Sequence, residues 1–262
     1  MRTHCRTKLR PLLFCAVLLC AQGCANRLQY RQLLDSAAAD VADLPGDLLQ
    51  DSKYVLSQRD NLLILSLAGG ASIAMNQGAD KDIQKSFDKH EIFHNFTDRT
   101  LKTFGHPGFH FAAVGAWYLA AIDNNDTLNH DRAWTTIRAL SLTTLATFSL
   151  KTIRNNDTPV DNSRAWPSGH TSSSFALASV LDEFYGPRVG LPAYALASLV
   201  GIRMMDQGDH WASDVVFGAA LGWVIGHSVA AKKELQFAGF KVLPCTITAH
   251  GPVLGVNFVK RF

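Results

Sequence analysis

The sequence lacks a strong excess of charge of either sign. Its 262 residues carry a formal net charge of +3, and charged residues make up only 18% of the chain. It also lacks a basic stripe interleaved with aromatic residues, which argues against a nucleic-acid-binding protein. Hydrophobic residues account for 47%, which excludes an intrinsically disordered chain. We therefore expect one substantial folded domain with appendages.

Cysteine is scarce in the body of the chain. Four of the five cysteines lie within the first 24 residues, and only Cys245 follows them. A disulfide framework is therefore not expected. Because no activating base stands near Cys245 in the sequence, we interpret it as structural rather than as a nucleophile.

The first 24 residues have the three parts of a secretion signal. A basic start precedes the apolar run 12–21, which is too short to span a bilayer comfortably. Small residues then lead to Cys24, which resembles the lipidated cysteine of bacterial lipoproteins. We predict export to the periplasm of the bacterial cell envelope. A lipid anchor at Cys24 and an uncleaved N-terminal anchor remain as alternatives.

Long uninterrupted hydrophobic runs are missing, but shorter apolar stretches recur with residues at helical spacing. They cover residues 62–75, 107–122, 135–153, 171–184, 191–205 and 211–231. After residue 232 the pattern changes, and 253–262 is typical of a strand that a Gly-Pro turn separates from an earlier one. The sequence thus predicts an all-α six-helix bundle with a small C-terminal β-hairpin.

The predicted organisation has four parts. They are a signal peptide (1–24), an N-terminal helical extension (25–60), the helical bundle (61–231) and the C-terminal hairpin extension (232–262).

The most specific motif is Pro-Ser-Gly-His at residues 167–170, directly before an apolar helix. Gly169 permits a tight turn, and the free N–H groups of a helix start form a ready anion site. Ser168 adds a hydroxyl donor, and His170 stands at the edge of such a pocket. The alternative interpretation is an ordinary helix N-cap.

A second motif is Arg203 followed by His210 and Asp214. His210 and Asp214 are four residues apart at a helix start, so they share one face and can meet. A carboxylate bound to one imidazole nitrogen fixes the tautomer and leaves the other nitrogen free to attack. A capping histidine with an aspartate on the same face is the alternative. Lys151, at the end of the third apolar stretch, is unremarkable alone because the helix dipole favours lysine there.

Together these pieces resemble the three-part signature of the type-2 phosphatidic acid phosphatase and vanadium haloperoxidase superfamily. That signature reads Lys, six residues, Arg-Pro; then Pro-Ser-Gly-His; then Ser-Arg, five residues, His, three residues, Asp. Order and separation match over about residues 60–230. The resemblance implies the helical bundle of that family.

Two parts of the signature differ in this chain. Thr158 stands where the first motif has arginine, and Ile202 replaces the serine before Arg203. Six residues rather than five then separate Arg203 from the histidine. The candidates to replace the missing phosphate contact are Arg154 and Arg164.

The resemblance implies a metal-independent phosphatase that needs no cofactor. His210 would attack phosphorus to give a phosphohistidine, Asp214 would orient it, and His170 would protonate the leaving oxygen and then activate water. The residues expected to hold the phosphate oxygens are Lys151, Ser168, Gly169 and Arg203. The expected substrate is a phosphorylated lipid, a pyrophosphate or a small phosphomonoester, and membrane association follows from a lipid substrate.

The same resemblance bears on membrane insertion. The six stretches are short, and several are diluted by polar residues or by a charge such as Arg138. If all six crossed a membrane after export of residue 25, the two motif-bearing loops would lie in the cytoplasm, whereas membrane members of the family generally work on the outer face. We therefore favour a bundle wholly in the periplasm over an integral inner-membrane protein.

Three other functions stay open. A vanadium-dependent haloperoxidase would use the same pocket, and a degenerate member that binds phospholipid without turnover is suggested by Thr158. Replacing Thr158 with Arg would separate a weakened enzyme from a binder. The remote alternative is a zinc metalloprotease, because His90, Glu91 and His94 spell the zinc-protease pattern on an expected surface helix. His106 and His110 form a second pair at the same spacing.

Overall fold

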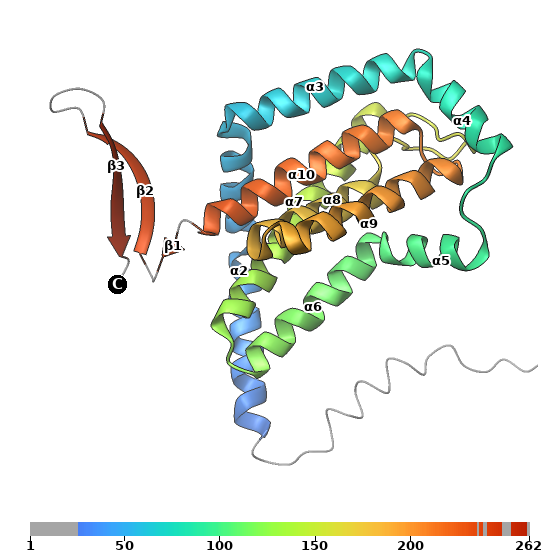
Figure 1. Cartoon of the computed structure of the whole chain (residues 1–262). Coiled ribbons are helices and arrows are strands. Elements are labelled where there is room, and N and C mark those ends of the chain that lie inside the picture. Colours follow the sequence, from blue (N-terminus) through green and yellow to red (C-terminus); the bar gives the residue numbers. More distant parts are fainter. Residues whose placement is uncertain (1–25, 235, 238–239, 248–252, 261–262) are drawn as a thin grey trace, which may run out of the picture.

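The computed structural model describes residues 26–234, 236–237, 240–247 and 253–260, so the predicted signal peptide and Cys24 lie outside it. Most of the described chain is helical (Figure 1). The helices are α2 (Asn26–Ser57), α3 (Arg59–Asn76), α4 (Ala79–Lys89), α5 (Asn95–Phe104), α6 (Pro107–Asp123), α7 (Thr127–Arg154), α8 (Gly169–Tyr185), α9 (Pro187–Asp206) and α10 (Ala212–Glu234).

The predicted all-α class is confirmed, and each of the six apolar stretches coincides with one helix. These helices are α3, α6, α7, α8, α9 and α10. Helices α4 and α5 were not predicted, because their sequences are mostly polar and only one residue of each is buried. α2 occupies most of the predicted N-terminal extension and continues through Pro45.

The helices that carry the motifs begin and end at recognisable capping residues. The Asp126 side chain accepts a hydrogen bond from the Asn129 amide at the start of α7, and the Ser168 hydroxyl does the same for the Thr171 amide at the start of α8. Asn155 ends α7 in the left-handed conformation. Local sequence therefore fixes the two helix ends that face the site.

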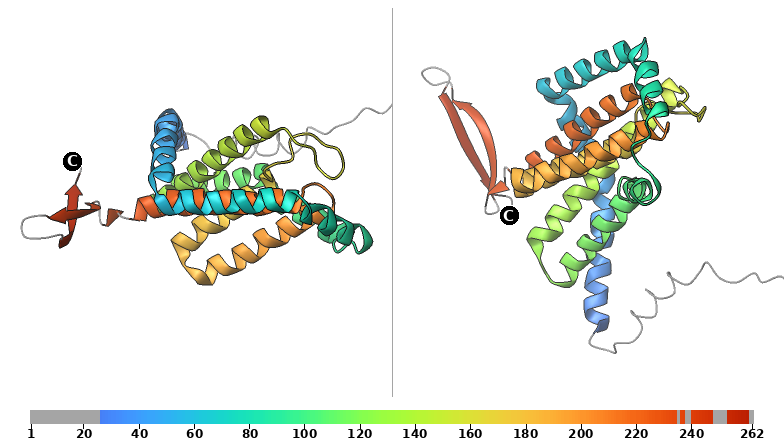
Figure 2. Two further views of the ribbon diagram at one scale, coloured as in Figure 1. Left: turned by 90° about the horizontal axis from the view of Figure 1, so that it is seen from above. Right: turned by 45° about the vertical axis from the view of Figure 1, so that its right-hand side comes forward.

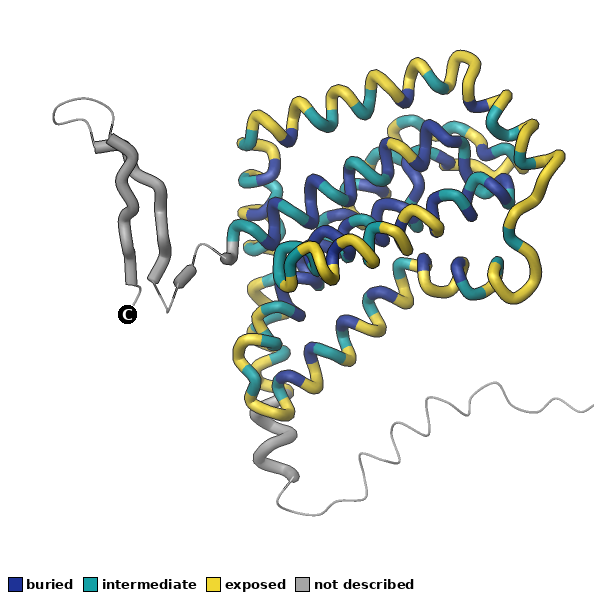
Figure 3. The backbone as a smooth tube through the Cα atoms, in the orientation of Figure 1, coloured by how far each residue is buried: buried dark blue, intermediate teal, exposed yellow. Residues whose placement is uncertain are grey.

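Helices α8 and α10 pack closely at the centre of the bundle. Glycines recur every fourth residue on α10, at Gly218, Gly222 and Gly226. A Cβ atom at Gly222 would lie 2.0 Å from the carbonyl oxygen of Ser172, and one at Gly226 would lie 2.5 Å from that of Ala176. Only glycine allows two helix backbones to approach this closely. Almost all of α10 is buried or half-buried along its length (Figure 3).

The other helices surround this central pair. α3 lies along α10, and α9 and α7 pack on α8 (Figure 2). α2 is joined to them by a buried ionic cluster, in which the fully buried Asp51 accepts hydrogen bonds from Arg138 of α7 at 2.8 and 2.9 Å and from Lys232 of α10 at 3.0 Å. Arg138, which dilutes an apolar stretch in the sequence, is thus paired inside the bundle.

The C-terminal residues form strands β1 (Gln236–Phe237), β2 (Phe240–Ile247) and β3 (Val253–Lys260) in the order β1-β2-β3. β2 and β3 pair antiparallel, from Phe240 opposite Lys260 to Ile247 opposite Val253. The predicted domain boundaries remain predictions.

Of the helices in the described ranges, α10 alone is long and apolar enough to cross a membrane by itself, over Ala212–Lys232, and 61% of its apolar window is buried. The central place of α10 in the bundle accounts for this apolar composition. α3 and α4, which meet at 67°, reach the same criterion only when taken as one bent span.

Replacing Gly222 with Ala should force α8 and α10 apart, because the new methyl group would meet backbone rather than a movable side chain. We expect the free energy of unfolding to fall by about 1–3 kcal/mol, measured by urea denaturation. The matched control is Gly70→Ala on the exposed side of α3, where nothing lies within 4 Å. That change should stabilise by up to about 1 kcal/mol. Equal effects at both positions would contradict the packing argument.

Candidate active site

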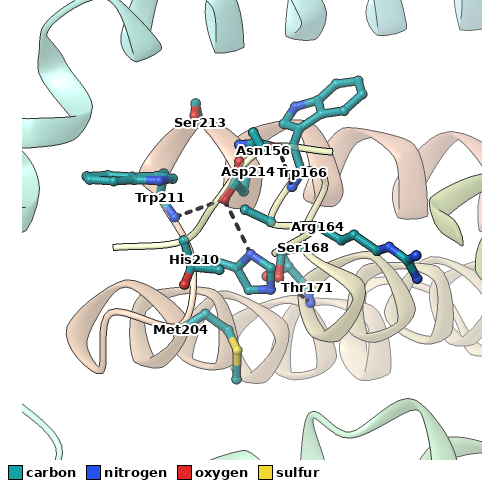
Figure 4. Close-up of polar contacts among 12 residues, drawn as sticks. Asn156, Arg164, Trp166, Ser168, Thr171, Met204, His210, Trp211, Ser213 and Asp214 are labelled. Carbon is teal, nitrogen blue, oxygen red and sulfur yellow. Dashed lines mark hydrogen bonds and ion pairs between the residues drawn. The ribbon is translucent and has the colours of Figure 1, made fainter. Parts of the chain in front are cut away.

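The three sequence motifs come together where α7 ends and where α8 and α10 begin. Figure 4 shows Ser168 of the second motif close to His210 and Asp214 of the third. The amide of Ser168 donates a 3.1 Å hydrogen bond to the backbone carbonyl of Asp214. This bond joins the Pro-Ser-Gly-His segment directly to the histidine–aspartate segment. The predicted convergence of distant pieces of sequence is therefore present in the fold.

His210 and Asp214 form the predicted pair. Nδ1 of His210 lies 3.3 Å from Oδ2 of Asp214, and the same oxygen accepts a hydrogen bond from the Trp211 amide at 3.0 Å (Figure 4). Asp214 is fully buried and His210 is 8% exposed. The contact through Nδ1 leaves Nε2 of His210 free, as a nucleophilic imidazole requires.

His170 lies near His210, at the start of α8. Burial lowers the pKa of His170 to about 3, and His210, His106, Arg203 and His110 add to the effect. Its Nε2 atom is buried and has no hydrogen-bond partner within the described part of the chain. The neutral ring is therefore poised to gain a proton once an anion enters the pocket.

Ser168 and Gly169 form the start of α8. The hydroxyl of Ser168 is fully buried and caps α8, and it also accepts a 2.9 Å hydrogen bond from the Thr171 hydroxyl. Gly169 lies inside the helix, where an added Cβ would make only ordinary contact with Thr147 at 3.8 Å. Both the N-cap interpretation and an anion site at this helix start fit the geometry.

Lys151 holds the loop that leads into α8. Its Nζ atom donates to the carbonyl oxygens of Arg164 at 2.5 Å and Ala165 at 2.9 Å. Burial lowers the pKa of Lys151 to about 8, against the opposing attraction of Asp214. An ammonium group has three donors, so one N–H beyond these two bonds can serve a ligand.

The loop 155–168 explains why threonine stands at position 158. Thr158 is 6% exposed, and its hydroxyl accepts a hydrogen bond from the Asn162 amide at 3.1 Å while its own amide donates to the Asn162 carbonyl at 2.8 Å. Thr158 thus closes a tight loop. The proposed Thr158→Arg exchange would break this loop, so it is not a clean test of a missing phosphate contact.

Arg154 and Arg164 differ in how they lie. The Arg154 guanidinium stacks over the Trp166 ring, 5.0 Å from its centroid. Arg164 is exposed, has a left-handed backbone (φ 63°), and its side chain extends away from His210 and Asp214 (Figure 4). The prediction that one of them holds phosphate remains a prediction.

Arg203 is buried and already engaged by two carboxylates. Its Nε donates to Oδ1 of Asp98 at 2.7 Å, its second terminal nitrogen lies 2.7 Å from the same oxygen, and its Nη1 pairs with Asp209. Arg203 is 3% exposed. The expected phosphate ligand is therefore present near the site but carries acidic partners that the sequence motif did not reveal.

The predicted surface helix at His90, Glu91 and His94 is wrong. His90 ends α4, residues 91–94 are not helical, and His94 precedes the first turn of α5. The zinc-protease pattern needs both histidines on one helical turn, and this backbone does not supply it. Among the residues that the structure describes, no three His, Cys, Asp or Glu side chains are grouped to hold a metal ion.

The sequence analysis gave other residues near the site no role in phosphate chemistry. The His106 ring lies edge-on to His170, with centroids 5.4 Å apart, and Nε2 of His110 donates a 2.6 Å hydrogen bond to the Phe104 carbonyl. Asp80 of α4 accepts from the amide (2.9 Å) and hydroxyl (2.6 Å) of Ser213, beside Asp214. The unpredicted helices α4 and α5 supply Asp80 and Asp98, so no motif could have identified them.

Comparison with known proteins agrees with this geometry. Residues 146–235 match the family model described as PAP2 superfamily. A lipid A 1-phosphatase of Porphyromonas gingivalis is 42% identical over 65 residues, which are 24% of this chain and 15% of that protein. The chain thus spans far less than two thirds of the length of that relative.

One solved structure shares the fold at low sequence identity. A transmembrane PAP2 type phosphatidylglycerolphosphate phosphatase from Bacillus subtilis superimposes with a TM-score of 0.58 and 18% identity, over 68% of this chain and 96% of that one. Aquifex aeolicus LpxE gives a TM-score of 0.48 and 21% identity, over 57% and 93% of the two chains. The segment 146–235, which contains the three motifs, is therefore similar to the PAP2 superfamily.

Proposed function

We propose that this chain is a phosphatase that hydrolyses a lipid-linked phosphomonoester or pyrophosphate through a phosphohistidine at His210. The observation that carries the proposal is the buried His210–Asp214 contact. Near this contact lie a second histidine, whose pKa is lowered by burial, the ammonium group of Lys151 and the start of α8. Each group has a task in a double displacement at phosphorus.

In the first step Nε2 of His210 attacks phosphorus, and the P–O bond to the leaving group breaks. Asp214 holds the ring through Nδ1 and stabilises the positive charge that develops on it. His170, protonated in the complex, gives its proton to the leaving oxygen. In the second step His170 takes a proton from water, which attacks phosphorus and releases His210 and inorganic phosphate. No step needs a metal ion.

The free amides at the start of α8 and the remaining N–H of Lys151 would hold the phosphate oxygens. The segment similarity to a lipid A 1-phosphatase supports a phosphorylated lipid as the substrate, and the small soluble phosphomonoesters remain the second substrate class. A lipid substrate implies work at the bacterial envelope, with either a periplasmic, lipid-anchored chain or an inner-membrane one.

A non-catalytic phospholipid-binding protein is the second candidate. It is favoured by two observations: Arg203 is paired with acids, and Thr158 is built into a loop instead of offering a cation. Both weaken the phosphate cradle compared with the family signature. Measured turnover separates this candidate from the phosphatase.

Removing the nucleophile His210 tests the phosphohistidine step. The mature chain should release phosphate from a generic phosphomonoester, and EDTA should not reduce the rate. His210→Ala should lower the rate by at least about a thousandfold, because the covalent step is lost. His94→Ala, an exposed histidine on the α4–α5 connection, serves as the matched control and should leave the rate unchanged. Absence of release from wild type across lipid and soluble phosphates would favour the binding candidate.

Anion binding should depend on pH through His170. The pKa of His170 is about 3 in the empty pocket, below its usual 6.5, and a bound dianion must raise it. The proposed general-acid role requires the pKa of His170 in the complex to reach the working pH. Binding then takes up a proton, and affinity for sulfate, a dianion throughout this range, should rise as pH falls from 8 to 6. The limit is about tenfold per pH unit. His170→Gln should flatten this dependence in calorimetric titrations. Parallel curves for the two proteins would rule out His170 as the proton acceptor.

Anion binding should also depend on the charge of Lys151. Because burial places its pKa near 8, sulfate affinity should fall further as pH rises above 8 and Lys151 loses its charge. Lys151→Met should bind sulfate weakly at every pH and lack this alkaline decline. An alkaline decline that persists in Lys151→Met would assign the decline to another group.

A further inference from the structure

The surroundings of Arg203 hold more charge than a phosphate cradle needs. Asp98 reaches its guanidinium from α5, and Asp209 reaches it from the connection between α9 and α10. Two carboxylates over-neutralise one guanidinium, so the group as a whole carries a net negative charge. A phosphate dianion approaching this group would be repelled rather than attracted while both carboxylates stay in place.

The two carboxylates are not equivalent. The Asp98 side chain is 22% exposed, belongs to a helix, and binds the Nε side of the guanidinium. The Asp209 side chain is 37% exposed, lies in a connection of five residues between helices, and binds the terminal nitrogen Nη1. Asp209 can therefore turn towards water at lower cost than Asp98.

The position of Asp209 in the chain links it to the reaction. It directly precedes His210, in the segment that is one residue longer than the family signature. Gly208 before it has a left-handed backbone (φ 66°), and the His210 amide after it donates to the Met204 carbonyl at 3.0 Å. The bond at His210 holds the catalytic residue in place, so the Asp209 side chain can move without it.

We propose that Asp209 is a specificity-determining residue that competes with the phosphate group for Arg203. In the empty site its carboxylate pairs with Nη1 of Arg203. An incoming phosphate displaces it and takes over that nitrogen, while Asp98 keeps the guanidinium oriented. A ligand therefore gains Nη1 of Arg203 only when the guanidinium attracts it more strongly than it attracts the Asp209 carboxylate. This inference rests on the proposed function, because it takes the pocket as a phosphate site.

The test is calorimetric titration of the mature wild-type chain and Asp209→Asn with inorganic phosphate, which needs no turnover. Asparagine keeps the shape of the side chain and removes its charge. We expect Asp209→Asn to bind phosphate about two- to fivefold more tightly, the range of a partly exposed ion pair. If hydrolysis is measurable, KM should fall by a similar factor while kcat changes less than about twofold.

The matched control is Asp161→Asn. Asp161 is an exposed acid on the neighbouring loop, and its left-handed backbone (φ 59°) suits asparagine. It should leave phosphate affinity unchanged. An equal gain in both variants would show a general charge effect and overturn a specific role of Asp209.

A double-mutant cycle with Arg203→Gln tests the pairing itself. In that background Asp209→Asn should no longer tighten phosphate binding, because no guanidinium remains to be released. A gain of the same size with and without Arg203 would overturn the proposal. If Arg203→Gln does not fold, as judged by thermal unfolding, the comparison with Asp161→Asn carries the decision.

The outcomes separate this inference from the proposed function. Tighter phosphate binding by Asp209→Asn in a chain that hydrolyses nothing would support the competition and reject the phosphatase. Unchanged phosphate affinity in an active phosphatase would reject the competition alone. Absence of phosphate binding to wild type and to Asp209→Asn would reject the competition as well.

Discussion

The close contact between α8 and α10 is the constraint on which the site depends. Glycines at every fourth position let the α10 backbone approach the Ser172 and Ala176 carbonyls to distances that no side chain would allow. The same contact brings the Ser168 amide to the Asp214 carbonyl at the first turns of both helices. α8 has Ser168 at its start, and α10 has Asp214 in its first turn. The distance between the two helices therefore sets the distance between these residues.

Burial around this contact makes the charged groups of the site interdependent. Asp214 is fully buried, one of its oxygens has no partner among the described residues, and Lys151 is the nearby cation that acts on it. Burial lowers the pKa of His170, and the nearby histidines and Arg203 lower it further. A pocket of this kind has a high electrostatic cost for extra positive charge when empty, and a bound dianion relieves it. Ligand binding and protonation are therefore coupled by the fold itself.

The sequence was sufficient to predict the helices that pack one face against the core and to locate the motifs at their ends. The six apolar stretches predicted α3, α6, α7, α8, α9 and α10, because helical spacing of apolar residues records packing against a core. It was insufficient for α4 and α5, which are short, polar and nearly unburied. Their contribution is made through single carboxylates, Asp80 and Asp98, whose partners lie more than 100 residues away. No periodicity marks such contacts.

The wrong helix prediction at His90–Glu91–His94 and the contact observed at His210–Asp214 have the same explanation. Both are histidine patterns of helical spacing, yet only the second lies at a helix start held by a neighbouring backbone. The first lies where α4 has ended, and Glu91 accepts from Gln207 at 2.9 Å rather than facing a ligand. Asp206 beside it accepts the amides of Ile92 and Phe93 at 2.7 and 2.9 Å. The segment thus serves to fasten the α4–α5 connection to the end of α9. Arg203 lies on α9 three residues before Asp206. The bonds from Asp206 to the α4–α5 connection therefore also help to hold Asp98 and Asp209 in position around the guanidinium.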